Sequence, residues 1–309
     1  KSIKPYFKIF LLPICSLPIL AYLGFRTNEF LKGTPYLEYL ENNIEAVGLD
    51  DSFAFDLKKE DLEDKKIILV GEINGFEAPI KIDVELFSFL RSVYGVTDYL
   101  AELDHSQAFY LNRYNDTGDE NLLDKVLAYW VVSAGRNNLD YREKYIQLRA
   151  LHLQFPFRYI GTNNLSDAEL LAQHLQELTS DEIFQFNPEK SDSLNVLALK
   201  TNVEQQAKND LSDQLKWELS FLLRNMNAFL EGQYREEVLT ENFLAMYDYH
   251  QLETKKVYGF YGLGHVIQAP LSVGFESMIS RVVKAKPELK NQVLRINFLF
   301  QYSHVVFFF

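Results

Sequence analysis

The sequence contains almost no cysteine: Cys15 is the only one among 309 residues. A disulfide within the chain and a zinc site built on cysteines are therefore excluded. Positive charge is also scarce, since 31 Lys and Arg residues stand against 43 Asp and Glu residues, for a net charge of -12. With neither a basic stripe nor basic residues interleaved with aromatic ones, nucleic acid is not an expected partner. Internal repeats and low-complexity segments are absent as well, which leaves an ordinary globular protein.

One long hydrophobic run is present, at residues 7–25, and its only charge is Lys8. Lys1 and Lys4 precede the run and Arg26 follows it. The length is at the short end of a membrane span and exceeds a typical signal-peptide core. We therefore expect residues 1–27 to be a single-pass membrane anchor or uncleaved signal, with the lysines cytoplasmic and the globular part extracytoplasmic. The alternative is a buried helix of a soluble protein.

The rest of the chain, residues 28–309, is predicted to form a single α/β domain. Strand-like and helix-like segments alternate, which is typical of a mainly parallel central sheet flanked by helices. Strands are expected at 66–70, 96–103, 157–160, 256–262 and 292–300. Helices are expected at 36–47, 77–94, 106–115, 120–132, 139–153, 166–177, 203–231, 235–249 and 273–283. The stretch from about 120 to 232 is predicted to be a large, mostly helical insertion.

Three of these helices carry specific terminal predictions. Ser166 is the expected N-cap of the helix at 166–177, with Glu169 as its capping-box partner. From residue 203 onward, apolar residues recur at spacings of three and four residues, which predicts one long helix that ends at Gly232. Gly95 is expected to end the helix at 77–94 in the left-handed conformation.

Polar residues follow three of the predicted strands at the point where each strand ends. The carboxyl ends of parallel strands meet at one edge of a sheet, where open α/β sheets bind ligands. Two carboxylates and a histidine there suit general acid–base chemistry, because each group shifts the pKa of the others. The same set has the donor atoms for a divalent metal, although we predict no metal or cofactor. The residues in question are Glu72, Asn74, Glu102, Asp104, His105 and His265.

Each of these residues also has a purely structural interpretation. Glu72 suits the N-terminus of the next helix, and Asp104 has the preferred side chain for an N-cap, which would leave His105 exposed in the first turn. Glu102 would pair with Arg91 or Arg113, and His265 would be a hydrogen-bonded core histidine. Arg235 and Asn242 lie seven apart on one helical face, where a structural role, such as a salt bridge from Arg235, is the default interpretation.

Three sequence islands resemble the erythromycin esterase-like proteins. They are Val70-Gly71-Glu72-Ile73-Asn74-Gly75-Phe76, then Tyr99-Leu100-Ala101-Glu102-Leu103-Asp104 leading into Leu111-Asn112-Arg113-Tyr114, then Gly262-Leu263-Gly264-His265-Val266. The wider group includes haem-binding iron-uptake lipoproteins and metalloprotease-like proteins. The resemblance implies a parallel α/β fold with a helical insertion and a cleft that contains Glu72, Glu102 and His265. Arg235 and Asn242 match an Arg and Asn of the family's preceding helix.

The sequence departs from the family pattern at two positions. Asn74 stands where the first motif has a histidine, the family's expected general base, and Gly262 stands where a late-strand histidine is expected. Asparagine cannot take up a proton near neutral pH.

The resemblance therefore implies one of two functions. The first is a hydrolase for a small ester-like substrate in the cell envelope. In it, Glu72 and Glu102 orient water, His265 acts as base, Asn74 occupies the remaining catalytic position, and Asp104, His105 and Arg235 bind substrate. The alternative is a catalytically silent relative that binds a small molecule, haem or metal in the same cleft. An envelope interaction protein without a small ligand is a third interpretation.

Overall fold

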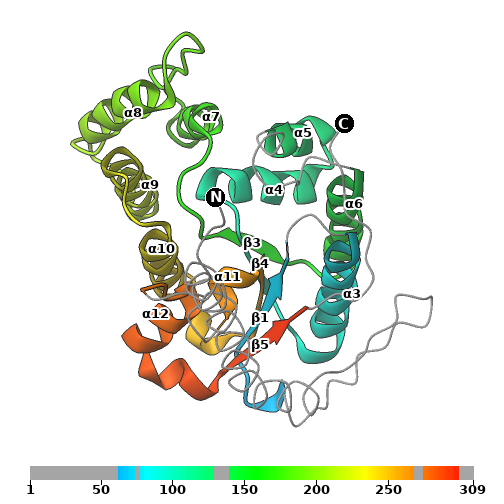
Figure 1. The fold of residues 1–309 in the computed structure, drawn as a ribbon. Coiled ribbons are helices and arrows are strands. Elements are labelled where there is room, and N and C mark those ends of the chain that lie inside the picture. Colours follow the sequence, from blue (N-terminus) through cyan, green and yellow to red (C-terminus); the bar gives the residue numbers. More distant parts are fainter. Residues whose placement is uncertain (1–61, 74–76, 129–138, 268–273, 299–309) are drawn as a thin grey trace, which may run out of the picture. The chain divides into compact units, whose positions relative to one another are not determined.

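The computed structural model describes residues 62–73, 77–128, 139–267 and 274–298 (Figure 1). All of them belong to one compact unit, Asp56–Phe309. The expected anchor at 7–25, the helix expected at 36–47 and the candidate residue Asn74 lie outside the described residues. Within the described ranges, no helix is both long enough and apolar enough to cross a bilayer.

Five parallel strands form the central sheet, which confirms the predicted α/β class. Their order across the sheet is β3-β2-β4-β1-β5. The strands are β1 (Ile67–Glu72), β2 (Asp98–Ala101), β3 (Arg158–Gly161), β4 (Val257–Gly262) and β5 (Val293–Asn297). Because β1 and β4 pair in register from Ile67↔Val257 to Glu72↔Gly262, the ends of these two central strands are level at the carboxyl edge.

Helices cover both faces of the sheet (Figure 1). Side chains alternate between the faces along each strand, so Ile67 and Leu69 of β1 join the core cluster that includes Phe243 and Ile279. On the opposite face Phe87 packs edge-on against Tyr99 of β2 at 5.0 Å between ring centroids. The first cluster includes α10 (Arg235–Tyr249) and α12 (Met278–Ala285), and Phe87 belongs to α3 (Glu77–Tyr94).

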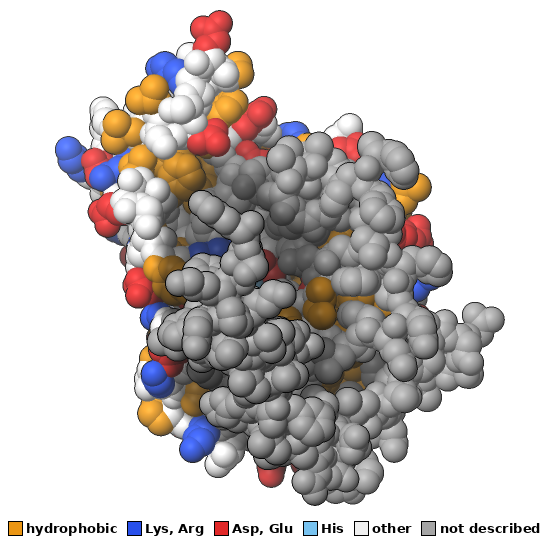
Figure 2. All heavy atoms as spheres, viewed as in Figure 1, with side chains coloured by type: hydrophobic (Ala, Val, Ile, Leu, Met, Phe, Trp, Pro, Cys, Tyr) orange, Lys and Arg blue, Asp and Glu red, His pale blue; other side chains and the backbone are white. Residues whose placement is uncertain are grey.

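The remaining helices connect and extend these layers. They are α4 (His105–Thr117), α5 (Glu120–Ala128), α6 (Leu139–Gln154), α7 (Ala168–Thr179), α8 (Asp192–Gln206), α9 (Asp213–Glu231) and the short α11 (Leu263–Val266). On α8, Leu194 and Leu197 are about half exposed, and Figure 2 shows hydrophobic, acidic and basic side chains interspersed in this part of the surface. Gly95 adopts a φ of 67° after α3, as predicted.

The helix predicted at 273–283 begins only at Met278, because Ser277 caps it by accepting from the Ser280 N–H. Two further helix predictions are wrong. The N-cap of α7 is Asp167, whose carboxylate accepts from the Leu170 N–H at 2.9 Å. Ser166 instead donates its N–H and hydroxyl to Asp104. The predicted long helix from 203 is two helices, because Ser212 caps a new one by accepting from the Leu215 N–H. In both cases a side-chain hydrogen bond available to Ser or Asp decided where the helix begins.

Candidate active site

Glu102 lies directly after β2 and is 7% exposed. Its Oε1 is 2.6 Å from Nη2 of Arg235 at the start of α10, and its Oε2 accepts from the backbone N–H of Gly262 at 2.6 Å. This carboxylate therefore ties the end of β2 to the end of β4 and to α10. Its arginine partner is neither Arg91 nor Arg113: these bind the carbonyl of Pro156 and the carboxylate of Glu177.

His265 lies in α11, the single turn that follows β4, and is 8% exposed. Its Nε2 is 3.6 Å from Oε1 of Glu102, and its Nδ1 is 2.6 Å from Oε1 of Glu236. The second oxygen of Glu236 accepts from the Met278 N–H at 2.7 Å, so this carboxylate is held by the start of α12. The imidazole is thus placed between two buried carboxylates that come from different elements.

These two carboxylates determine the protonation of His265. Burial alone lowers the pKa of an imidazole, but hydrogen bonding and charge attraction from Glu102 and Glu236 outweigh burial and raise the pKa of His265 to about 9. At neutral pH the side chain is therefore an imidazolium. A cation can donate a proton or stabilise negative charge, whereas the expected role as a base requires the neutral form.

Glu72 is the last residue of β1 and is 2% exposed. The Tyr141 hydroxyl of α6 donates to it at 3.1 Å. Glu72 and Glu102 both line a small cavity of about 20 Å³, together with Lys144. That volume accommodates about one water molecule. Glu72, Glu102 and His265 thus all lie at the carboxyl edge of the sheet.

A buried ion pair lies beside this cavity and carried no signal in the sequence. Lys144 of α6 and Asp83 of α3 are 2.5 Å apart and at most 4% exposed. The hydroxyls of Tyr99 and Tyr258 donate to the two oxygens of Asp83, each at 2.6 Å. The Lys144 ammonium also lies 4.3 Å from the ring centroid of Phe260. The pair therefore joins two helices to two strands, and Lys144 lines the same small cavity as Glu72.

Asn163 is a further part of the site that the sequence analysis did not identify. Arg235 donates from Nε to its side-chain oxygen at 3.1 Å, and Asn242 donates to its backbone carbonyl at 3.1 Å. The two helix residues singled out for their spacing thus meet at one residue rather than at each other. Asn163 follows the strand that ends at Gly161, so the strand-end rule applied to this strand would have found it.

The other two candidates bind residues outside the Glu102–His265 pair. Asp104 is the N-cap of α4, in a capping box with Gln107, which confirms its structural interpretation. Burial raises its pKa, although hydrogen bonds from Ser166 and Gln107 oppose the change. His105 is not an exposed first-turn residue. Its side chain is 17% exposed, and Nε2 lies 2.6 Å from Oε2 of Glu218 on α9.

Across the described ranges, no three His, Cys, Asp or Glu side chains are grouped as a metal site would require. The charged groups at the carboxyl edge are already paired with one another. Glu102 contacts both Arg235 and His265, and His265 also contacts Glu236. The chemistry that this arrangement supplies directly is proton donation and the stabilisation of negative charge.

Comparison with known proteins gives a likeness in fold. No family model matches the sequence, and no curated protein matches it. Among solved structures, a histidine-to-asparagine variant of the erythromycin esterase EreC in an open conformation superposes with a TM-score of 0.53 at 13% identity, over 79% of this chain and 72% of that one. A succinoglycan biosynthesis protein superposes with a TM-score of 0.56 at 14% identity, over 82% of this chain and 71% of that one.

A protein from Bacillus cereus is similar to the same degree, with a TM-score of 0.54 at 13% identity over 77% of this chain and 67% of that one. The fold is therefore the erythromycin esterase-like α/β fold that the three motifs predicted. At such identities the likeness concerns the fold alone, so the activity has to be argued from the site.

Proposed function

We propose that the protein is a hydrolase for a small ester-like substrate that binds at the carboxyl ends of β1, β2 and β4. The observation that carries this proposal is the His265 imidazolium held between Glu102 and Glu236. Buried charges are costly, and replacing a buried ion pair by apolar side chains is often neutral or stabilising. Groups with strongly shifted pKa values that cluster at a ligand-binding edge are typical of functional sites.

The proposed roles follow from the charges. Glu72 orients the attacking water and accepts its proton. Arg235, whose side chain is 43% exposed, marks the side from which substrate approaches. Its guanidinium stabilises the negative charge that develops on the carbonyl oxygen. Protonated His265 then donates to the leaving alkoxide, and Glu102 positions both cations. His265 is an acid in this scheme and not a base.

The test is turnover of a panel of activated esters by the parent, by Glu102→Gln and by Glu237→Gln. Glu237 lies beside Glu236 but is 46% exposed and pairs with Arg281, so it is a matched control. Loss of a proton-transfer group costs roughly 100- to 10,000-fold. Glu102→Gln should approach a loss of this size, because it removes the carboxylate that positions the proton donor His265 and the cation Arg235. Turnover that Glu102→Gln leaves unchanged would contradict the proposal.

A second candidate is a silent relative that binds a small ligand in the same cleft. Asn74 in place of the family's histidine favours it, because this replacement removes the expected base. If this candidate is correct, the parent shows no turnover on the panel, and Asn74→His introduces activity that Glu72→Ala abolishes. A parent as active as Asn74→His would exclude it.

A further inference from the structure

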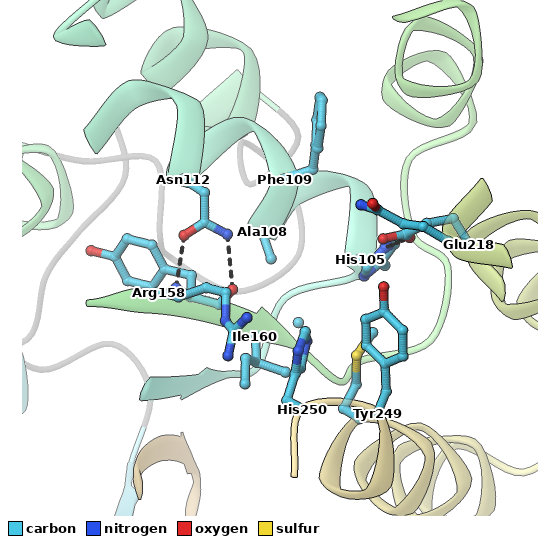
Figure 3. Close-up of a pocket in the computed structure, with 13 residues that line it drawn as sticks. His105, Ala108, Phe109, Asn112, Arg158, Ile160, Glu218, Tyr249 and His250 are labelled. Atoms are coloured by element: carbon cyan, nitrogen blue, oxygen red, sulfur yellow. Dashed lines mark hydrogen bonds and ion pairs between the residues drawn. The ribbon is translucent and has the colours of Figure 1, made fainter. Parts of the chain in front are cut away.

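A second and much larger cavity lies along β3, the strand at one edge of the sheet. Its volume is about 540 Å³, within the range of small-molecule pockets. Figure 3 shows side chains of α4, β3, α9 and the C-terminal end of α10 arranged around it. The residues of the proposed hydrolase site, Glu72, Glu102, Arg235 and His265, do not line it. It is therefore a separate site.

The charges in and behind the wall of this cavity balance. Glu218 faces His105, and Arg158 binds Asp98, which also lies 3.6 Å from Lys255. The two carboxylates, Asp98 and Glu218, thus stand against two cations, Arg158 and Lys255. A ligand with a full charge would find Asp98 and Arg158 already paired with each other and Glu218 already in contact with His105.

His250 adds a polar group without charge. Burial lowers its pKa to about 4, and the nearby Arg158 acts in the same direction. At neutral pH its imidazole therefore carries one N–H donor and one acceptor nitrogen. Gln214 and the Tyr249 hydroxyl line the same cavity and also offer both donors and acceptors. This combination suits hydroxyl groups, which donate and accept at once.

The aromatic side of the cavity is firmly supported. The Tyr249 ring stacks on Trp217 with centroids 3.5 Å apart and planes at 10°, and Trp217 stacks on Phe221 at 5.2 Å. Across the cavity, Phe109 stacks on His174 at 4.0 Å. Rings held in this way offer apolar contact area with little loss of conformational entropy on binding.

The edge of β3 is closed to an added peptide strand. Asn112 of α4 donates from its side-chain amide to the Tyr159 carbonyl at 2.9 Å and accepts from the Tyr159 N–H at 2.8 Å. A peptide that extended the sheet would need these same backbone groups. The cavity therefore suits a small molecule rather than a peptide strand.

From these features we infer that the cavity along β3 binds an uncharged, hydroxyl-rich ring molecule, in the class of neutral mono- and disaccharides. Gln214, Tyr249 and His250 would bind its hydroxyls, and the supported rings would contact its apolar face. The inference does not depend on the proposed hydrolase activity.

The test is binding of glucose, galactose, maltose and lactose to the full chain, measured by ligand-observed NMR and calorimetry. Glucuronate and glucosamine serve as charged analogues of matched size. Saturable binding of at least one neutral sugar is expected, with weaker binding of its charged analogue. Tyr249→Ala should weaken binding by about tenfold or more. Because that change removes a stacked ring, the exposed Gln214→Leu provides a second variant with little risk to folding, also expected to weaken binding.

Two controls separate this site from the other one. Tyr234→Phe alters a tyrosine that is 44% exposed and does not line the cavity, and His265→Gln alters the proposed hydrolase site. Both should leave sugar binding unchanged. The inference is overturned if none of the neutral sugars binds, if the charged analogues bind more tightly, or if Tyr249→Ala and Gln214→Leu bind like the parent.

Discussion

At the scale of single residues, the central feature is a buried histidine that two carboxylates keep protonated. Glu102 lies at the end of β2 and Glu236 in the first turn of α10, so neither is a neighbour of His265 in sequence. Breaking a buried charge cluster by removing one member leaves an uncompensated charge, which is costly. The fold therefore holds the imidazolium and its partners as a unit.

This unit predicts a pH dependence of stability. The folded-state pKa of His265 is raised from 6.5 to about 9. Its stabilising contribution is therefore fully present below about pH 6.5 and is lost as the pH rises through 9. The free energy of unfolding should fall by on the order of 1 to 3 kcal/mol over this interval. Urea titrations at several pH values should show this slope in the parent and a flatter one in His265→Gln. An equal slope in both would contradict the assignment.

The sequence identified part of this site, and the reason for each omission is physical. Glu102 and His265 were found because each lies at the end of a predicted strand and within a motif. Arg235 was found because it matches an arginine of the family's helix before the last motif. Glu236 was missed because an acidic residue in the first turn of a helix is normally expected to be solvated and to interact with the helix dipole. Here it faces inward, 3% exposed, and only tertiary packing determines that.

At the scale of secondary-structure elements, one ion pair fastens two helices to the sheet. Asp83 of α3 and Lys144 of α6 meet over β2 and β4, where Tyr99 and Tyr258 complete the hydrogen bonds of the carboxylate. Burial and these bonds to Asp83 raise the pKa of both tyrosine hydroxyls. The hydroxyls therefore remain protonated donors.

A double-mutant cycle tests this arrangement. Asp83→Leu leaves the Lys144 ammonium buried without its counter-charge and should lower the free energy of unfolding by roughly 3–5 kcal/mol. Lys144→Met alone should also destabilise, because it leaves the carboxylate uncompensated. The double variant should recover most of the loss. Chemical denaturation measures all four proteins, and additive losses would show that the two side chains are not coupled.

Element boundaries were harder to predict than element types. All five described strands and α10 fall where the sequence places them, because apolar runs and helical periodicity are strong local signals. The break between α8 and α9 was missed because apolar residues recur at helical spacing on both sides of it. The start of α7 was missed because Ser166 has a competing tertiary partner in Asp104.

At the scale of the whole molecule, the sheet and its helices resemble EreC at 13% identity. A parallel sheet requires apolar strands covered on both faces and short turns at the carboxyl edge, and many sequences satisfy these conditions. The fold class could therefore be predicted from pattern alone. The cavity along β3 could not, because its wall combines residues of four elements that no sequence spacing relates.

A whole-molecule prediction concerns the hydrophobic run at residues 7–25. We expect the full chain to partition into the membrane fraction and a chain that begins after residue 27 to be soluble. Fractionation of cells that express each form measures this. Recovery of the full chain in the soluble fraction without detergent would show that the anchor prediction is wrong.

The most direct test of the account is the pH profile of kcat/KM for the best ester of the panel, because it reports the protonation state in which His265 works. If His265 acts as a cation, activity falls as the pH rises through about 9. Glu236→Gln should move this fall to lower pH because one of the carboxylates that hold the proton is lost, and Glu237→Gln should not. Activity that instead rises through pH 9, or a fall that Glu236→Gln does not move, would contradict the account.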